Sequence, residues 1–338
     1  MNLQHRIDLL VRLGEYILSG EKDWLEAKEK ASYENGWFIP EFIDHAVAAI
    51  ASSFLQRNIL EKWIAPHQPV VLQTPKTIGI VMAGNIPLAG FHDWLCVFIS
   101  GHKALVKPSS KDQVLIEHLL KKITEWDRRA EEDIQFAALL KGCDAYIATG
   151  SNNSSRYFDY YFGKYPHIIR RNRTSAAILT GDESNKELEA LADDVFLYFG
   201  LGCRNVTSLR VPVNYDFLPI LAAFKKYNRL ADHHKYKNNL DYNLALHLLN
   251  KVVYMANGSV LLIEDPRLFS PISQLNYSFY KNRDETIQNL QAEPDLQGIV
   301  GKGFIPFGGA QYPSITDYAD KVDTLGFLMG LPDCDKNP

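Results

Sequence analysis

From residue 77 onward, short strand-like apolar runs alternate with stretches of helical periodicity. Residues 77–83, 104–107, 145–149 and 176–179 each have the composition of a buried strand. A helical pattern follows each of these runs, and the longest covers residues 111–126. Strands separated by helices in this way pair in parallel. The alternation therefore predicts an α/β fold with a mostly parallel, doubly wound sheet, whose crevices lie at the carboxyl ends of its strands.

The segments on either side of this alternation predict further parts of the fold. Residues 1–65 repeat apolar side chains at three- and four-residue spacing, which is typical of helices. A second α/β unit begins near Cys203. Its strand-like runs lie at 206–211, 260–263 and 277–280. We therefore expect two domains, one formed by residues 1–198 together with 311–338 and the other by residues 199–310.

Composition excludes several classes of protein. The chain has 338 residues and a formal net charge of −4, and its densest basic cluster, Arg170-Arg171-Asn172-Arg173, is too short to indicate a nucleic-acid surface. No apolar run reaches the roughly 18 residues that span a bilayer, and residues 1–8 lack the apolar core of a signal peptide. We therefore expect a cytoplasmic protein that neither spans a membrane nor binds nucleic acid.

The cysteines and histidines do not have the spacing of a metal site. The four cysteines, Cys96, Cys143, Cys203 and Cys334, are far apart in the sequence. No Cys-x-x-Cys pair is present, and the ten histidines form no His-Glu-x-x-His pattern. We therefore expect neither a disulfide framework nor a bound metal.

Two polar turns follow the first two predicted strands. Asn85 comes directly after the first strand, where its side-chain amide can donate to an oxyanion; alternatively, asparagine is there because turns favour it. Lys107 ends the next strand and is followed by Ser109 and Ser110. This cation and these hydroxyls can bind the ribose and phosphate of a nucleotide, or they can form an ordinary solvated strand end.

A third turn, Gly150-Ser151, ends the strand at 145–149 and begins a helix. Free backbone N–H groups at a helix N-terminus favour a phosphate. The alternative is that Ser151 is an ordinary N-cap. Three turns able to bind anions at successive strand ends support one another as parts of a single site.

Cys203 lies in Phe199-Gly200-Leu201-Gly202-Cys203-Arg204-Asn205, between a helical run and a strand-like run. Glycines allow close approach of a substrate to the backbone, and a nearby cation such as Arg204 favours the thiolate. The turn therefore has the composition of a site for covalent acyl chemistry. The alternative is a small buried apolar residue, which is the commoner role of a single cysteine.

Taken together, these segments resemble the aldehyde dehydrogenase superfamily. More closely, they are similar to the acyl-CoA reductases related to the fatty-acid reductase of bacterial luminescence, the LuxC-like branch. The resemblance covers roughly residues 77 to 328 and implies a Rossmann-type cofactor domain, with residues 1–65 as its helical N-terminal region, and a second α/β catalytic domain. The segments that carry it are Ala83-Gly84-Asn85-Ile86-Pro87, Leu105-Val106-Lys107-Pro108-Ser109-Ser110, Thr149-Gly150-Ser151, Gly202-Cys203-Arg204-Asn205, Pro306-Phe307-Gly308-Gly309 and Asp317-Tyr318-Ala319-Asp320.

The resemblance implies a role for each turn. Cys203 would be the nucleophile, and Asn85 together with the backbone N–H of Cys203 would form the oxyanion hole. Lys107 and Ser109 would hold the adenosine ribose, and Gly150-Ser151 would lie near the dinucleotide. The family's segment that contacts the nicotinamide ribose has no clear counterpart in this sequence.

The cofactor expectation depends on Ser110. In NAD-preferring relatives, a glutamate three residues after the lysine binds the ribose hydroxyls, whereas this chain has Ser110 followed by Lys111. Loss of a carboxylate and gain of a cation should admit a 2′-phosphate. We therefore expect NADPH, with NADH as the alternative.

Arg170 marks a second departure from the family pattern. Aldehyde-oxidising relatives carry a glutamate that activates the deacylating water, and the matching stretch here places Arg170 at that position. Without this base, water should attack the acyl-enzyme poorly. The intermediate would then survive to receive a hydride, as a thioester reductase requires. The arginines of this stretch would either contact coenzyme A phosphates or lie on the surface.

The function implied by the resemblance is NADPH-dependent reduction of a fatty acyl-CoA, or of another acyl thioester, to the aldehyde through an acyl-Cys203 intermediate. The alternatives are a cysteine-dependent acyltransferase or thioesterase, an NAD(P)-dependent aldehyde dehydrogenase, and a catalytically silent subunit. Analogy with the family also implies a homo-oligomer. The candidates for a general acid are His92, His102, His233 and His234.

Overall fold

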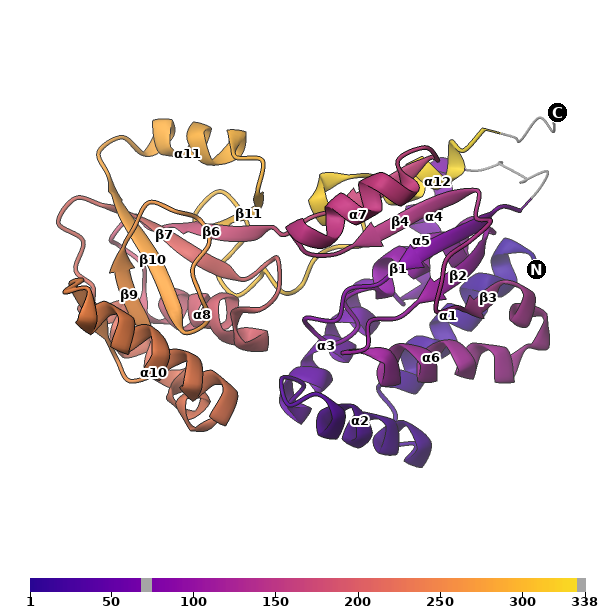
Figure 1. Ribbon diagram of the computed structural model, residues 1–338, viewed down its shortest axis with the longest axis horizontal. Helices are drawn as coiled ribbons and strands as arrows, with labels where there is room; N and C mark the ends of the chain where they lie inside the picture. Colours follow the sequence, from indigo (N-terminus) through magenta and orange to yellow (C-terminus); the bar gives the residue numbers. More distant parts are fainter. Residues whose placement is uncertain (68–74, 333–338) are drawn as a thin grey trace. The chain divides into compact units, whose positions relative to one another are not determined.

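The computed structural model describes residues 1–67 and 75–332 and divides into two compact units. The first unit comprises Met1–Asn172 and the segment from Ser314 onward, and the second comprises Arg173–Pro313. Figure 1 shows a separate sheet in each unit. Cys334 lies outside the described residues.

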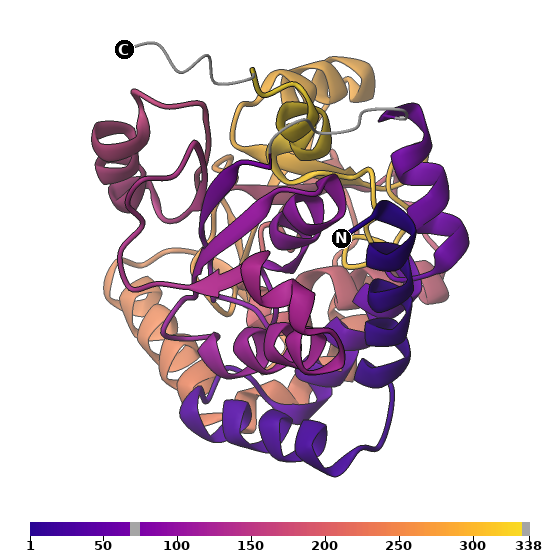
Figure 2. The same cartoon turned by 90° about the vertical axis from the view of Figure 1, so that its right-hand side faces the viewer.

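Four helices begin the first unit and confirm the expected helical N-terminal region. The second helix ends at Glu34, and Pro40 occupies the first turn of the third, where its missing N–H is tolerated. The four are α1 (Leu3–Ile17), α2 (Lys22–Glu34), α3 (Pro40–Ser53) and α4 (Arg57–Ile64). In Figure 2 these indigo helices lie beside the purple strands of the first sheet, with which they share one apolar core.

The first sheet has five parallel strands in the order β3-β2-β1-β4-β5. Its strands are β1 (Thr77–Val81), β2 (Lys103–Lys107), β3 (Ile134–Phe136), β4 (Ala145–Thr149) and β5 (His167–Arg170). Its helices are α5 (Phe91–Ser100), α6 (Gln113–Trp126), α7 (Asn152–Phe162) and α12 (Thr324–Met329). The strand order reverses between β1 and β4, and such a switch point opens a crevice at the carboxyl ends of the strands.

The second sheet has six strands in the order β11-β6-β7-β10-β9-β8, and β8 alone runs antiparallel to its neighbour. The strands are β6 (Thr174–Ile178), β7 (Val206–Pro212), β8 (Tyr254–Ala256), β9 (Leu261–Glu264), β10 (Gln274–Tyr280) and β11 (Leu296–Val300). The helices of this unit are α8 (Asn185–Phe196), α9 (Leu218–Ala223), α10 (His234–Leu249) and α11 (Arg283–Ala292). Short 3₁₀ segments in the chain are η1 (Ala65–His67), η2 (Arg128–Glu132), η3 (Leu197–Gly200), η4 (Phe224–Asp232) and η5 (Ala319–Lys321).

The α/β fold class agrees with the prediction, but the units divide at other residues than expected. The second unit begins at Arg173 and ends at Pro313, rather than covering residues 199–310. The reason is that β6 pairs with β7 and β11 and makes no ladder with the first sheet. The alternation of strand and helix in the sequence is the same on both sides of Arg173, so it does not reveal the change of sheet.

Within the described residues, no helix is long and apolar enough to cross a bilayer. The same residues contain no group of three or more His, Cys, Asp or Glu side chains arranged to hold a metal ion.

Candidate active site and cofactor-binding edge

Cys203 lies on the turn between η3 and β7 in the second unit. The turn is entered through Tyr198, Phe199 and Gly200, whose φ angles of 56°, 57° and 74° are all left-handed. Bulky residues keep this conformation only where the surroundings hold it, and the rings of Tyr198 and Phe199 are buried. Cys203 itself is half-buried, whereas Cys96 and Cys143 are buried. Its environment is thus that of a presented thiol and not of an enclosed core residue.

The side chain of Asn205 stabilises the Cys203 turn through hydrogen bonds to its backbone. Its side chain is fully buried, its Oδ1 accepts the N–H of Gly202 at 2.8 Å, and its Nδ2 donates to the carbonyl oxygens of Leu197 at 2.9 Å and Asp194 at 3.0 Å. The backbone N–H of Asn205 also donates to the Gly202 carbonyl. A buried amide bonded on both sides fixes the backbone around Cys203. In the sequence, Asn205 stands out only as part of the Cys203 motif, and nothing there indicates this supporting role.

Asp194 joins the glycine-rich loop near residue 308 to the same helix end. Its carboxylate, fully buried at the end of α8, accepts the N–H groups of Gly308 at 2.7 Å and Ala310 at 2.9 Å. Burial is the main cause that raises the pKa of Asp194, to about 7, and the two N–H donors oppose it. α8 therefore supports both Gly-rich segments of the second unit, through the Asp194 carboxylate and through its backbone carbonyl to Asn205.

Asp194 should make stability depend on pH. The folded protein holds the proton up to about pH 7, whereas an unfolded aspartate releases it near pH 4. Stability should therefore fall as the pH rises from about 4 to about 7, by a total of about 4 kcal/mol. Asp194→Asn should remove this fall, as measured by denaturant unfolding at several pH values. Asp193→Asn, which removes a carboxylate bonded to Lys226 and Tyr227 at the surface of α8, should leave it in place. If the free energy of unfolding depended on pH in the same way in wild type and Asp194→Asn, Asp194 would not be the group responsible.

In the first unit, the predicted polar turns lie at one edge of one sheet. Val81 at the end of β1 is paired with Lys107 at the end of β2 and with Ala148 of β4, so the three strands end together. Asn85 is exposed in the turn after β1, and Lys107 and Ser110 are exposed at the end of β2. The structure thus brings together Asn85, Lys107, Ser109, Ser110, Gly150 and Ser151 at the carboxyl edge, and it places Cys203 in the other unit.

The turns after β1 and β2 are in direct contact. A Cβ added to Gly84 would lie 2.5 Å from the Oγ of Ser109, so only glycine fits here. Asp112, which is buried, accepts the N–H of Leu88 at 2.6 Å and so ties the start of α6 to the Asn85 turn. Burial raises the pKa of this carboxyl well above its usual range. The arrangement fixes Asn85 and Ser109 on one rigid edge.

The Gly150-Ser151 turn differs from a simple phosphate loop. The N–H of Gly150 donates to the carbonyl of Arg170 at 3.3 Å, within the pairing of β4 with β5. Ser151 is the N-cap of α7, since its Oγ accepts the N–H of Ser154 at 3.3 Å. The capping role weighed from the sequence is therefore present. Binding of a dinucleotide near this turn remains a prediction.

Arg170 is a structural residue of the first unit. Its guanidinium is 2% exposed and donates to the Asp93 carboxylate at 2.8 and 3.3 Å, to the Thr324 Oγ1 at 2.6 Å and to the Ala319 carbonyl at 2.5 Å. Neither role weighed for it, phosphate contact or surface position, describes this buried ion pair. The position of the family's glutamate therefore holds no carboxylate, and the cation there is committed to α5 and the C-terminal segment.

The four candidate histidines fall into two groups. His102 is 1% exposed and bonded through both ring nitrogens, to the N–H of Lys76 at 3.1 Å and to the Leu328 carbonyl at 3.1 Å. Burial lowers the pKa of His102. The ring of His92 forms a hydrogen bond with the Ile315 carbonyl at 2.9 Å. Both are structural residues of the first unit. His233, beside the exposed His234, packs against Phe199 of the Cys203 turn, with ring centroids 4.6 Å apart.

The residues at the edge of the first sheet fit a dinucleotide cofactor. Lys107 and Lys111 are both exposed. Neither side chain makes an ion pair with any of the described residues. Two such cations beside Ser109 and Ser110, at the carboxyl end of the strand next to β1, suit a phosphate-bearing ribose. Residue 110, where NAD-preferring relatives have a glutamate, is a serine and carries no carboxylate.

Comparison with known proteins agrees with this architecture. The model of the LuxC acyl-CoA reductase family matches residues 44–209, a range that includes Cys203 and the three polar turns of the first unit. No curated protein matches the chain.

Solved structures of aldehyde dehydrogenases share the fold. Aldehyde dehydrogenase 21 from Physcomitrella patens, solved with succinate, has a TM-score of 0.72 and 11% identity over 97% of this chain and 84% of that one. The NADP-dependent glyceraldehyde-3-phosphate dehydrogenase from Bacillus halodurans, solved with NADP, has a TM-score of 0.63 and 13% identity over 89% and 74%. An NAD-dependent aldehyde dehydrogenase from Sinorhizobium meliloti has a TM-score of 0.64 and 12% identity over 89% of this chain and 70% of that one. The chain is therefore similar to the LuxC acyl-CoA reductase family over residues 44–209 and has the fold of the aldehyde dehydrogenases.

Proposed function

We propose that the chain reduces a fatty acyl-CoA thioester to the aldehyde with NADPH, through a thioester on Cys203. The observation that carries the proposal is the Cys203 turn. A half-buried thiol follows the left-handed segment of residues 198–200, and the fully buried Asn205 holds the turn that carries it through the N–H of Gly202. Such a fixed, presented thiol suits a covalent nucleophile. The match to the acyl-CoA reductase family model supports the thioester as substrate.

The reaction is balanced in two stages. The Cys203 thiolate attacks the thioester carbonyl, the bond from that carbon to the coenzyme A sulfur breaks, and the released thiolate takes up a proton. NADPH, when bound, supplies a hydride to the acyl carbon. Asn85 is proposed to donate to the resulting oxyanion, which then collapses to free aldehyde and the Cys203 thiolate. In sum, acyl-CoA, NADPH and a proton give aldehyde, NADP⁺ and coenzyme A.

Arg170 supports reduction over hydrolysis. Release of a carboxylic acid from the acyl-enzyme needs a base that activates water. The side chain at the corresponding position is a cation buried against Asp93, and it cannot take a proton from water. We therefore propose that the acyl-enzyme persists until the hydride arrives.

A steady-state assay tests this function. With a fatty acyl-CoA and NADPH, we expect aldehyde, free coenzyme A thiol and NADP⁺ to appear in equal amounts. With the aldehyde, NADP⁺ and no thiol acceptor, we expect at most slow turnover. Rapid oxidation of the aldehyde to the acid under the second condition would contradict the proposal and favour an ordinary aldehyde dehydrogenase.

The preference for NADPH should reverse when a carboxylate is placed at residue 110. Ser110→Glu should weaken NADPH binding at least tenfold, because the carboxylate repels the 2′-phosphate, and should strengthen NADH binding through the ribose hydroxyls. Ser110 is exposed, so the fold should tolerate the change. Gln113→Glu, which adds the same charge at an exposed site in the first turn of α6, is the control and should change the ratio of the two Kd values little. An unchanged ratio in Ser110→Glu would place the 2′-phosphate elsewhere.

A further inference from the structure

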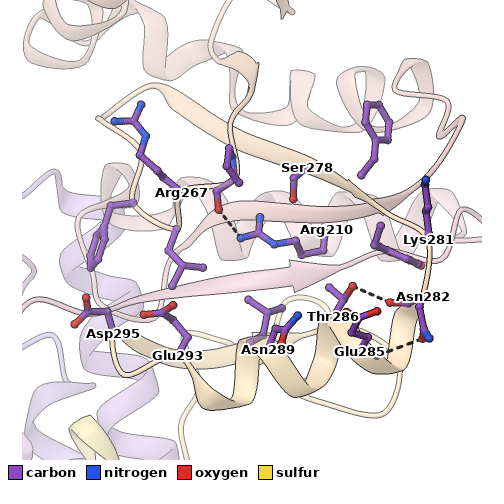
Figure 3. A pocket seen from close by; sticks show the side chains of 16 residues that line it. Arg210, Arg267, Ser278, Lys281, Asn282, Glu285, Thr286, Asn289, Glu293 and Asp295 are labelled. Atoms are coloured by element: carbon purple, nitrogen blue, oxygen red, sulfur yellow. Dashed lines mark hydrogen bonds between the residues drawn. The ribbon is translucent and has the colours of Figure 1, made fainter.

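A cavity of about 720 Å³ lies in the second unit, between strands β7 and β10 and helix α11 (Figure 3). Small-molecule sites typically have volumes of about 300–1,000 Å³. None of the residues assigned above to the Cys203 turn or to the cofactor edge lines this cavity. A ligand of this cavity would therefore bind at a site separate from the residues of the proposed reaction.

The strands beneath the cavity present polar side chains at the centre of the sheet. In the register of the two strands, Arg210 of β7 faces Ser278 of β10, and Ser208 faces Asn276. Central parallel strands are normally apolar on both faces, because helices cover them. A pair of polar cross-strand neighbours therefore indicates a function for this face other than packing.

Arg210 is a buried cation without a carboxylate partner. It is 9% exposed, and its guanidinium donates to the Ser208 Oγ at 2.6 Å, the Leu209 carbonyl at 3.2 Å and the Pro266 carbonyl at 2.9 Å. It forms no ion pair with any residue that the structure describes, and its Nε–H has no acceptor there. The nearby Asp265 is engaged by Arg267, 2.8 Å away. A buried charge in this state is unfavourable unless an anion joins it.

The residue opposite Arg210 has unused hydrogen-bonding capacity. The Ser278 hydroxyl is half-buried and makes no hydrogen bond with the described residues, and Figure 3 shows it beside the Arg210 side chain. Lys281, at the end of β10, also lines the cavity and forms no ion pair with them. A carboxylate would meet a guanidinium, a hydroxyl and an ammonium at this place, each of which is a donor to such a group.

The rest of the lining limits the kind of anion. Apolar side chains from β10, from α11 and from the loop before Ser270 form much of the wall; they are Leu268, Phe269, Phe279, Tyr280 and Leu290. Glu285, Glu293 and Asp295 line the side formed by α11 and the residues after it (Figure 3). These three carboxylates share the lining with Arg210 and Lys281, so a ligand with one negative charge suits the cavity better than a polyanion such as a nucleotide or coenzyme A.

We infer that this cavity binds a monocarboxylate with an apolar body, with its carboxylate on Arg210 and Ser278. The site is distinct from the Cys203 turn, and its ligand enters no covalent step. Because Arg210 also holds the Pro266 carbonyl, its replacement would disturb the loop as well as the site. The test therefore rests on Ser278, which binds nothing else in the described chain.

The test is calorimetric titration of the full chain with octanoate, 1-octanol and inorganic phosphate. We expect octanoate to bind with a Kd below about 1 mM and the other two at least tenfold more weakly. Ser278→Leu fills the cavity and should weaken octanoate at least tenfold, whereas Ser278→Ala keeps the space and should stay within about threefold of wild type. Both variants should retain aldehyde formation, so a failure here is separable from a failure of the proposed reaction.

Three outcomes would overturn the inference. Equal octanoate affinity in Ser278→Leu and wild type would place the ligand elsewhere, for example at the Cys203 site. Octanol binding as tightly as octanoate would remove the role of Arg210 as the anion partner. Phosphate binding more tightly than octanoate would replace the monocarboxylate by another class of anion.

Discussion

Replacing Cys203 by alanine is expected to lower aldehyde formation from acyl-CoA by about four orders of magnitude or more, the scale of losing a covalent nucleophile. Affinity for NADPH should stay within about twofold of wild type, because the proposed cofactor residues Lys107, Ser109 and Ser110 lie in the other unit. The half-buried Cys203 side chain packs in no enclosed core, so the protein should remain folded. The measurement is the initial rate of aldehyde formation, together with a cofactor titration of each protein.

Cys143→Ala is the matched control for this experiment. Cys143 is 4% exposed and lies against Gly79 of β1, so its replacement should affect stability slightly and the reaction hardly at all. If Cys203→Ala retained more than about a hundredth of the wild-type rate, the acyl-enzyme on Cys203 would be ruled out as the main route. Equal losses in both variants would indicate a general effect on folding.

Replacing Arg170 by methionine is expected to lower the free energy of unfolding by about 3–5 kcal/mol, the usual effect of stranding one member of a buried ion pair. Asp93, 7% exposed, would be left without a bonded cation among the described residues. The Thr324 hydroxyl and the Ala319 carbonyl would also lose their donor, which should loosen the C-terminal segment. Denaturant unfolding, followed by a probe in the first unit such as tryptophan fluorescence, measures the effect.

Two further variants separate the ion pair from a general loss of packing. Arg171→Met removes an exposed arginine paired with Asp159 at 3.1 Å and should have an effect below about 1 kcal/mol. Arg170→Met combined with Asp93→Asn should regain part of the loss, because no buried charge remains. If the double variant were as unstable as the sum of its single changes, the ion pair would not be the cause.

The strand and helix pattern of the first unit could be read well from the sequence. The runs at 77–83, 104–107 and 145–149 are apolar and bounded by polar turns, and they became β1, β2 and β4. The helical periodicity of residues 1–65 likewise became four helices. Each of these elements buries apolar side chains at regular spacing, and burial of one face is what produces a clear apolar pattern.

The elements that the sequence did not reveal have weaker patterns. β3 and β5 have only three and four residues, and β5 ends in Arg170, whose burial depends on Asp93, distant in the sequence. α11 has one buried residue, Leu290, and so lacks an apolar stripe. The boundary at Arg173 is set by which sheet β6 joins, and strand pairing of this kind is a long-range property that local composition does not carry.

The candidate site shows the same division. Short motifs identified Cys203 and the turns with Asn85, Lys107 and Ser109, because glycine and polar residues at strand ends are visible locally. The buried supports, Asn205 and Asp194, were not recognised, since an asparagine or aspartate in the sequence gives no sign of which N–H groups it accepts. Asn205 at least lies within the Cys203 motif, whereas Asp194 lies six residues before Gly200 and beside a second aspartate, so the local sequence gives no signal for it.

The most direct test of the account is the intact mass of the protein after incubation with a fatty acyl-CoA, before and after addition of NADPH. We predict an added mass of one acyl group on wild type and none on Cys203→Ala. Addition of NADPH should remove this mass as the aldehyde appears. An adduct that NADPH leaves in place would contradict the reductase account and indicate an acyltransferase, and the absence of any adduct would contradict the role of Cys203 as nucleophile.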